Sequence, residues 1–405
     1  MMRFLQLVLP GVSMIAVTYG LARFSFGLLL PEVNASLEMS EFVSGMISSL
    51  FYFAYCFTII LSTVMTTKDG PRRMILLAGL SAFIGLFLMG VTPNVWILAL
   101  GVLFAGGSTG LVSPPYGAAI SLWMRGDQQG KANTWINSGT SFGIALSGLG
   151  AYFLTSDWRF TYLIYAFLTL LILIWNYRAI PKGENRSIRF EKGNLSIRGV
   201  KGATTLVLAS LMLGISTAAF WTFSRTFIQV AGDYSDWQLA GFWIVIGIFG
   251  VLGGFSGSLV EKGGLSFSYK IGAVCIASSS LILAISPEEM VMAYLAAAIF
   301  GCSYIFITGV LLVWGIRVFI RNASLGIGVP FLVLALGQVI GSILAGGVIE
   351  ATSYTTLFIV YGFIGMTATF LAPKEENHFT IRRGFSNVTH RLKKGIKYKC
   401  ESSFY

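Results

Sequence analysis

Two arginines lie inside otherwise apolar stretches of the chain. Arg23 lies eight residues before Pro31, and Arg225 lies eight residues before Asp233. The planar guanidinium of arginine matches a carboxylate or a phosphate through two parallel hydrogen bonds. A buried charge is costly, so two of them at the same spacing require an explanation. We interpret them as an anion-binding site; hydrogen bonding to carbonyls, hydroxyls or water between helices is the alternative.

Uncharged polar and aromatic residues in the same apolar stretches are further candidates for this site. Their hydrogen-bonding groups should face a cavity or a neighbouring helix, because exposing them to an apolar environment is costly. The candidates are Tyr19, Tyr52, Tyr55, Asn137, Trp221, Tyr304 and Gln338. Bonds between helices explain any one of them as well as ligand contact does. The sequence contains no catalytic triad, metal-ligand cluster or phosphate-binding glycine loop, so we expect no enzyme activity, cofactor or metal.

The apolar stretches that carry these residues are long enough to cross a membrane. A helix of about 20 residues spans the hydrocarbon core of a bilayer. The run 74–124 is too long for one span, and Val91-Thr92-Pro93-Asn94 supplies a turn that divides it. We therefore expect twelve spans, from the runs 4–22, 42–67, 74–124, 132–156, 160–177, 202–224, 237–260, 271–287, 290–316, 322–349 and 351–373.

Within this arrangement the two arginines should lie near mid-membrane. Eight helical residues correspond to about 12 Å, which predicts the same depth for both. An arginine there costs at least roughly 2.5 kcal/mol. No Asp or Glu is expected near the midplane, since Glu32 and Glu350 lie at outer span ends. We therefore predict two arginines without acidic partners that converge across a central cavity.

Basic residues between the spans predict the orientation of the chain. Of the 28 Lys and Arg residues, 25 fall on one side and Arg159 alone on the other. Positive residues favour the cytoplasmic side, so both termini are expected to be cytoplasmic. The net charge of +11 is then explained by anionic lipid and not by nucleic acid. With 55% hydrophobic and 11% charged residues, the sequence indicates no sizeable soluble domain, and we expect a monomer in the bilayer.

The chain also contains an internal repeat. The segment Gly257 to Gly264, with Glu261 and Lys262, follows the eighth span, and Thr63 to Gly70 follows the second at an offset of 194 residues. Gly143 and Gly337 are related by the same offset. The repeat predicts two homologous six-helix bundles. The expected organisation is a bundle over 1–178, a basic linker over 179–202, a second bundle over 203–372 and a basic tail over 373–405.

These repeated loops resemble those of the major facilitator superfamily, over roughly residues 1–372. The resemblance implies a secondary transporter that works by alternating access around a site between the halves. In that family the loops latch one face, which implies a gating role for Gly70, Arg72, Arg73, Gly257, Glu261, Lys262 and Gly264. Thr67 stands where the family usually has Asp. A similar arginine pair, one per half, serves organic-phosphate exchangers of the superfamily.

The opening run Arg23 to Pro31 resembles the YbfB/YjiJ-like set of bacterial facilitators. This implies a carrier in the bacterial cytoplasmic membrane. We expect its substrate to be a small organic anion, moved with or without a coupling ion. Efflux of drugs or metabolites with a largely apolar body is the alternative, favoured by the aromatic-rich spans and by a partial antiporter glycine pattern at Gly130, Gly139, Gly143 and Gly148.

Overall fold

The computed structural model describes residues 4–153, 157–181, 200–320 and 323–374. Within these ranges the regular structure is helical, with no β-strand. The elements are α1 (Phe4–Ile15), η1 (Ala16–Phe24), α2 (Ser25–Leu37), α3 (Glu41–Asp69), α4 (Pro71–Gly90), α5 (Val95–Trp123), α6 (Gly126–Phe153), α7 (Trp158–Ala179), α8 (Ala203–Ala231), α9 (Asp236–Gly250), η2 (Val251–Phe255), α10 (Ser256–Gly263), α11 (Leu265–Ile285), α12 (Met290–Val318), α13 (Ala323–Ala351), α14 (Tyr354–Ala368) and η3 (Thr369–Leu371). Most of the predicted linker and tail lies outside the described residues.

Eleven helical segments of the described chain are long and apolar enough to cross a membrane. The remaining predicted span corresponds to α6, which is equally helical over 28 residues. Its first turns carry Asp127, Gln128, Gln129 and Lys131, and these polar residues lower its hydropathy. The chain is thus an all-α, multi-pass membrane protein. The first span is longer than its apolar run, because helix continues from Phe4 to Leu37.

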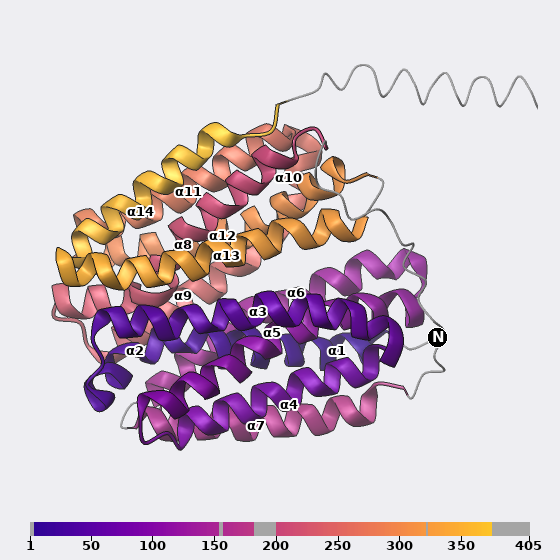
Figure 1. The fold of residues 1–405 in the computed structure, drawn as a ribbon, viewed down its shortest axis with the longest axis horizontal. Coiled ribbons are helices and arrows are strands. Elements are labelled where there is room, and N and C mark those ends of the chain that lie inside the picture. Colours follow the sequence, from indigo (N-terminus) through magenta and orange to yellow (C-terminus); the bar gives the residue numbers. More distant parts are fainter. Residues whose placement is uncertain (1–3, 154–156, 182–199, 321–322, 375–405) are drawn as a thin grey trace, which may run out of the picture. The chain divides into compact units, whose positions relative to one another are not determined.

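The helices of residues 4–372 form two neighbouring groups (Figure 1), with α1 to α7 in one and α8 to α14 in the other. The groups meet mainly where α2 packs on α8, α3 on α13 and α6 on α9. In Figure 1 the indigo α3 runs alongside the orange α13. The fold is therefore a pair of six-helix bundles that meet along these helices.

A local sequence signal explains where α5 begins. The predicted turn in the run 74–124 is confirmed, since α4 ends at Gly90 and α5 begins at Val95. The side chain of Asn94 accepts hydrogen bonds from the backbone N–H groups of Trp96 and Ile97, both at 3.1 Å. It thereby satisfies donors that the first helical turn leaves free.

The two repeated loops share one backbone conformation. Gly70 has φ 79° and ψ 161° and precedes α4, while Gly264 has φ 86° and ψ 161° and precedes α11. A positive φ is easily adopted only by glycine. The offset of 194 residues that relates the loops in sequence therefore relates the same turn in space.

The same offset also relates two helix crossings. A Cβ atom added to Gly20 would overlap the backbone of Gly143 on α6. In the second bundle, a Cβ atom on Gly337 of α13 would lie 2.9 Å from the Cα of Gly214 on α8. Gly20 and Gly214 are themselves 194 residues apart. Small residues let backbones approach closely in membranes, so each bundle is built around an equivalent glycine crossing.

We expect Gly20→Ala to destabilise the protein by about 1–3 kcal/mol, the usual cost of overpacking. The added methyl group meets backbone atoms, which cannot rotate away as a side chain can. Thermal unfolding of the protein purified in detergent measures the effect as a lower Tm. The matched control is Gly117→Ala in α5, because a Cβ atom there meets nothing within 4 Å. Equal Tm values for both variants would contradict the crossing as a tight contact.

Candidate functional site

Arg23 lies on a π-helical segment in the middle of the first span. The π-helix η1 covers the nine residues Ala16–Phe24. Helices of this kind are rare and are frequently found at functional sites. The Arg23 side chain is buried, with 7% of its surface exposed. Its charge is therefore held inside the protein.

Aromatic rings enclose the Arg23 guanidinium. Its Cζ atom lies 4.6 Å from the ring centroid of Tyr52, 5.0 Å from that of Phe24, 5.4 Å from that of Tyr55 and 5.9 Å from that of Tyr19. Each ring presents partial negative charge to the cation, for about 0.5–2 kcal/mol per contact. The rings partly compensate the charge but leave it formally unpaired. Arg23 forms no ion pair with an acidic residue in the described part of the chain.

Gln338 accepts a side-chain hydrogen bond from Arg23. The Arg23 Nη2 atom donates to Oε1 of Gln338 at 3.2 Å, while Arg23 Nε is buried and has no hydrogen-bond partner among the described residues. The Gln338 amide in turn donates to Tyr304 Oη at 3.3 Å and to Thr217 Oγ1 at 3.5 Å. Because Gln338 lies on α13, this chain of bonds crosses from one bundle to the other.

Trp221 and Tyr304 extend the aromatic enclosure into the second bundle. The Trp221 ring lies 4.1 Å from the ring of Phe24 and 5.0 Å from that of Tyr304, centroid to centroid. The indole Nε1 of Trp221 is buried without a hydrogen-bond partner. On the opposite side, the Tyr19 hydroxyl bonds Ser113 Oγ at 2.9 Å and the carbonyl of Thr109 at 3.2 Å. The enclosure therefore keeps both polar and aromatic surface around one cation.

Arg225 has an acidic partner, so the prediction of an unpaired arginine there was wrong. Its Nη1 and Nη2 atoms donate to the two carboxylate oxygens of Glu32 at 2.8 and 2.6 Å. The prediction assumed that equal spacing from the outer span ends gives both arginines the same depth. By the glycine crossings, the equivalent of Arg23 is Thr217, and Arg225 lies level with Pro31, one residue before Glu32. The described contacts thus bring Arg225 to Glu32 and Arg23 to Gln338.

Asn137 lies outside this enclosure. Its side chain is exposed, and its amide donates to the backbone and side-chain oxygens of Asn133, one turn earlier on α6. A bond within its own helix satisfies the amide. The other six polar candidates, Tyr19, Tyr52, Tyr55, Trp221, Tyr304 and Gln338, all lie around Arg23 or its hydrogen-bond chain.

Two further contacts join the bundles at the end that carries Glu32. The Tyr354 hydroxyl donates to Glu41 Oε1 at 2.6 Å, and the Phe42 backbone N–H donates to Glu350 Oε1 at 2.9 Å. Both connect the start of α3 to the adjoining ends of α13 and α14. Together with the pair of Glu32 and Arg225 they close this end of the structure. The sequence placed Glu32 and Glu350 at outer span ends but predicted no contact between the bundles for them.

The predicted gating loops lie at the ends of α3 and α10. Arg72 donates to the carbonyl of Tyr177 at 2.7 Å, and Arg73 pairs with Asp69 at 3.5 Å on the surface. Glu261 and Lys262 are exposed near the end of α10, and Gly257 has open space around it. These contacts fix the loop after α3 to α7. A latching role for either loop stays a prediction.

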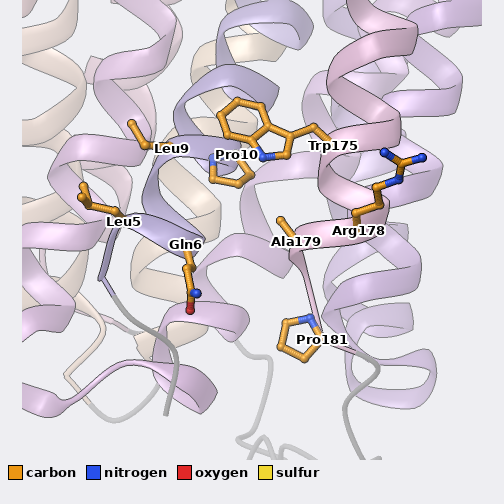
Figure 2. A pocket seen from close by; sticks show the side chains of 8 residues that line it. All are labelled: Leu5, Gln6, Leu9, Pro10, Trp175, Arg178, Ala179 and Pro181. Atoms are coloured by element: carbon orange, nitrogen blue, oxygen red, sulfur yellow. The ribbon is translucent and has the colours of Figure 1, made fainter.

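A pocket of about 520 Å³ lies away from Arg23, against the outside of α7. Figure 2 shows its lining, which comes from the start of α1 and from the end of α7. Trp175 and Arg178 contribute its aromatic and charged groups. An aromatic ring beside a basic residue is typical of the membrane interface, so this pocket is suited to lipid. The described residues hold no group of three His, Cys, Asp or Glu side chains that could bind a metal.

Residues 12–329 match the family model described as Major Facilitator Superfamily. The chain is 23% identical over 374 residues to the transcription regulatory protein OpdE of Pseudomonas aeruginosa, across 89% of this chain and 92% of that protein. It is 21% identical over 253 residues to the uncharacterized MFS-type transporter YceJ of Bacillus subtilis, across 60% and 64% of the two chains.

Solved transporter structures share the fold. The nucleoside transporter NupG superimposes with a TM-score of 0.74 at 15% identity, over 90% of this chain and 98% of that one. A POT family transporter in complex with 5-aminolevulinic acid gives 0.73 at 13% identity, over 91% and 94%. At these identities the likeness concerns the arrangement of helices alone.

Proposed function

The chain belongs to the Major Facilitator Superfamily, and from this membership we propose that it is a secondary transporter of a small organic anion, which Arg23 binds between the two bundles. The observation that carries the proposal is a buried guanidinium that has no acidic partner among the described residues and that donates to a neutral amide of the second bundle. A charge held this way costs free energy that an anionic ligand recovers.

The contacts between the bundles support a mechanism of alternating access. The end with Glu32, Glu41 and Glu350 is closed by bonds between the halves. We assign this end to the outer face of the bacterial cytoplasmic membrane, because the basic loops predict that the opposite end faces the cytoplasm. The described state is then closed to the outside, and transport requires these contacts to break. We also propose that the two bundles cover residues 1–178 and 203–372, and that the chain is related to the YbfB/YjiJ-like set of bacterial facilitators.

Efflux of an apolar substrate remains a second candidate because one observation favours it. Phe24, Trp221, Tyr304 and Phe300 form a continuous aromatic surface, with Phe300 5.1 Å from Trp221. Aromatic surface suits an apolar body. The adjacent positive charge of Arg23 repels lipophilic cations, so the organic anion is the better fit.

Thermal unfolding of the purified protein with small carboxylates, lipophilic cations and neutral aromatic compounds tests the proposal. We expect carboxylates to raise Tm, because a ligand that binds only the folded state stabilises it. The stabilising carboxylate should then enter vesicles that contain the protein. Stabilisation by lipophilic cations alone would favour efflux. Binding without flux would favour a regulatory role, such as the name of the Pseudomonas relative carries.

A further inference from the structure

We infer that Gln338 occupies the place of the substrate carboxylate in the described state, and that the site accepts a single carboxylate carried on a ring-containing body. The inference rests on the proposed function and names its substrate class. Arg23 is the charged group of the site, yet it is 7% exposed and does not line the pocket formed by α1 and α7.

The charges of the two arginines limit the ligand to one negative charge. Glu32 neutralises Arg225 through two hydrogen bonds. Arg23 keeps one uncompensated positive charge, which a monocarboxylate balances. A dianion would leave a second negative charge buried without a partner, at a high desolvation cost.

Gln338 has the geometry of a stand-in for that carboxylate. Its Oε1 atom accepts from Arg23 at 3.2 Å, as a carboxylate oxygen would. The amide is held from behind by Tyr304 and Thr217, and it is 1% exposed. The Arg23–Gln338 bond has one ionised partner, whereas a carboxylate adds Coulomb attraction and a second acceptor oxygen for the guanidinium fork. An arriving carboxylate can therefore displace the amide oxygen, engage the free Arg23 Nε and break a contact that joins the bundles.

The rings around Arg23 indicate the body of the ligand. The rings of Tyr52, Phe24 and Tyr55 lie 4.6 to 5.4 Å from the guanidinium carbon, so a carboxylate bound to Arg23 would carry its body next to them. Trp221 continues this surface from the second bundle. Offset and edge-to-face contacts with these rings favour an aromatic acid over an aliphatic one.

Two substitutions at Gln338 test the stand-in, with benzoate as the probe and benzamide as its neutral counterpart. Gln338→Glu supplies a resident carboxylate, so we expect a higher Tm without ligand and at least a tenfold weaker Kd for benzoate. Gln338→Met keeps the volume and removes the competing oxygen. It should lower the ligand-free Tm and tighten the benzoate Kd relative to that of the wild type. Benzamide should bind none of the proteins.

The ligand-free arm tests the inference separately from the proposed function. If Gln338→Glu raises Tm, Arg23 accepts a carboxylate at this place, and the rise should disappear when Arg23→Gln is added. An unchanged or lower Tm for Gln338→Glu, or equal loss of benzoate binding in both Gln338 variants, would overturn the stand-in. A wild-type protein that no carboxylate stabilises would instead contradict the proposed function.

Discussion

Arg23→Gln is expected to abolish carboxylate-dependent transport while leaving the protein folded. Truncating one partner of a buried charged pair costs about 2–5 kcal/mol of binding, which is at least roughly 25-fold in Kd. Only a small loss of stability is expected, from the bond to Gln338 and the ring contacts, because Arg23 has no acidic partner among the described residues and its removal strands no charge. Ligand titration by thermal unfolding and uptake into vesicles measure the two effects.

Arg23→Lys is the matched control for the charge. Lysine keeps the positive charge but loses the planar fork, so it should retain weak carboxylate binding. The expected order of affinity is wild type, Arg23→Lys, then Arg23→Gln. Wild-type transport in Arg23→Gln would remove Arg23 from the site.

The fold could be predicted from the sequence because a membrane imposes a simple rule on composition. Spans must be long and apolar, and the turn at Asn94 has a recognisable cap. The start of α6 was the exception. Helix α6 begins at Gly126, and its first residues, which include Asp127 and Lys131, are polar, so the apolar run begins later than the helix itself. Apolar runs locate spans, whereas helix ends also depend on packing and capping.

The candidate site was predicted in its residue types but not in its pairings. Polarity in an apolar span selected Tyr52 and Gln338, which lie at Arg23, and equally selected Asn137, which bonds its own helix. Sequence does not distinguish these outcomes, because both satisfy the polar group. The π-helix η1 positions Arg23, but none of the sequence patterns above predicts a π-helix.

The depth of Arg225 shows why register matters. Counting from the outer span ends put Arg225 level with Arg23, whereas the crossing of Gly214 with Gly337 places it level with Pro31. The offset of 194 residues was visible in the sequence through Gly143 and Gly337. Applied to Arg225, it would have pointed to the neighbourhood of Glu32.

Breaking the pair of Glu32 and Arg225 is expected to open the closed end of the protein. The pair joins α2 to α8 through two short hydrogen bonds. Arg225→Gln leaves the Glu32 carboxylate without its partner, and Glu32→Gln leaves the Arg225 guanidinium, which is 6% exposed. Fully buried pairs cost about 3–5 kcal/mol when one partner is removed. Since Glu32 is 32% exposed, about 1–3 kcal/mol is expected here.

A cysteine at Ser48 reports this opening. Ser48 on α3 is buried, and its hydroxyl bonds Thr222 on α8 at 2.9 Å, one turn before Arg225. In a background without native cysteines, Ser48→Cys should react slowly with a water-soluble maleimide in intact cells. Adding Glu32→Gln or Arg225→Gln should accelerate the reaction at least roughly fivefold, the factor that corresponds to 1 kcal/mol.

The exchanged pair separates the ion pair from a general loss of packing. Glu32→Arg combined with Arg225→Glu restores opposite charges across the same helices, so labelling of Ser48→Cys should slow again towards the original rate. Glu38→Gln, at an exposed acid on the same end, should leave the rate unchanged. If the exchanged pair labels as fast as either single variant, the contact between α2 and α8 depends on packing around Arg225 and the ion pair is not the gate. If neither single variant labels faster, the bonds of Glu41 with Tyr354 and of Glu350 with Phe42 hold this end closed without it.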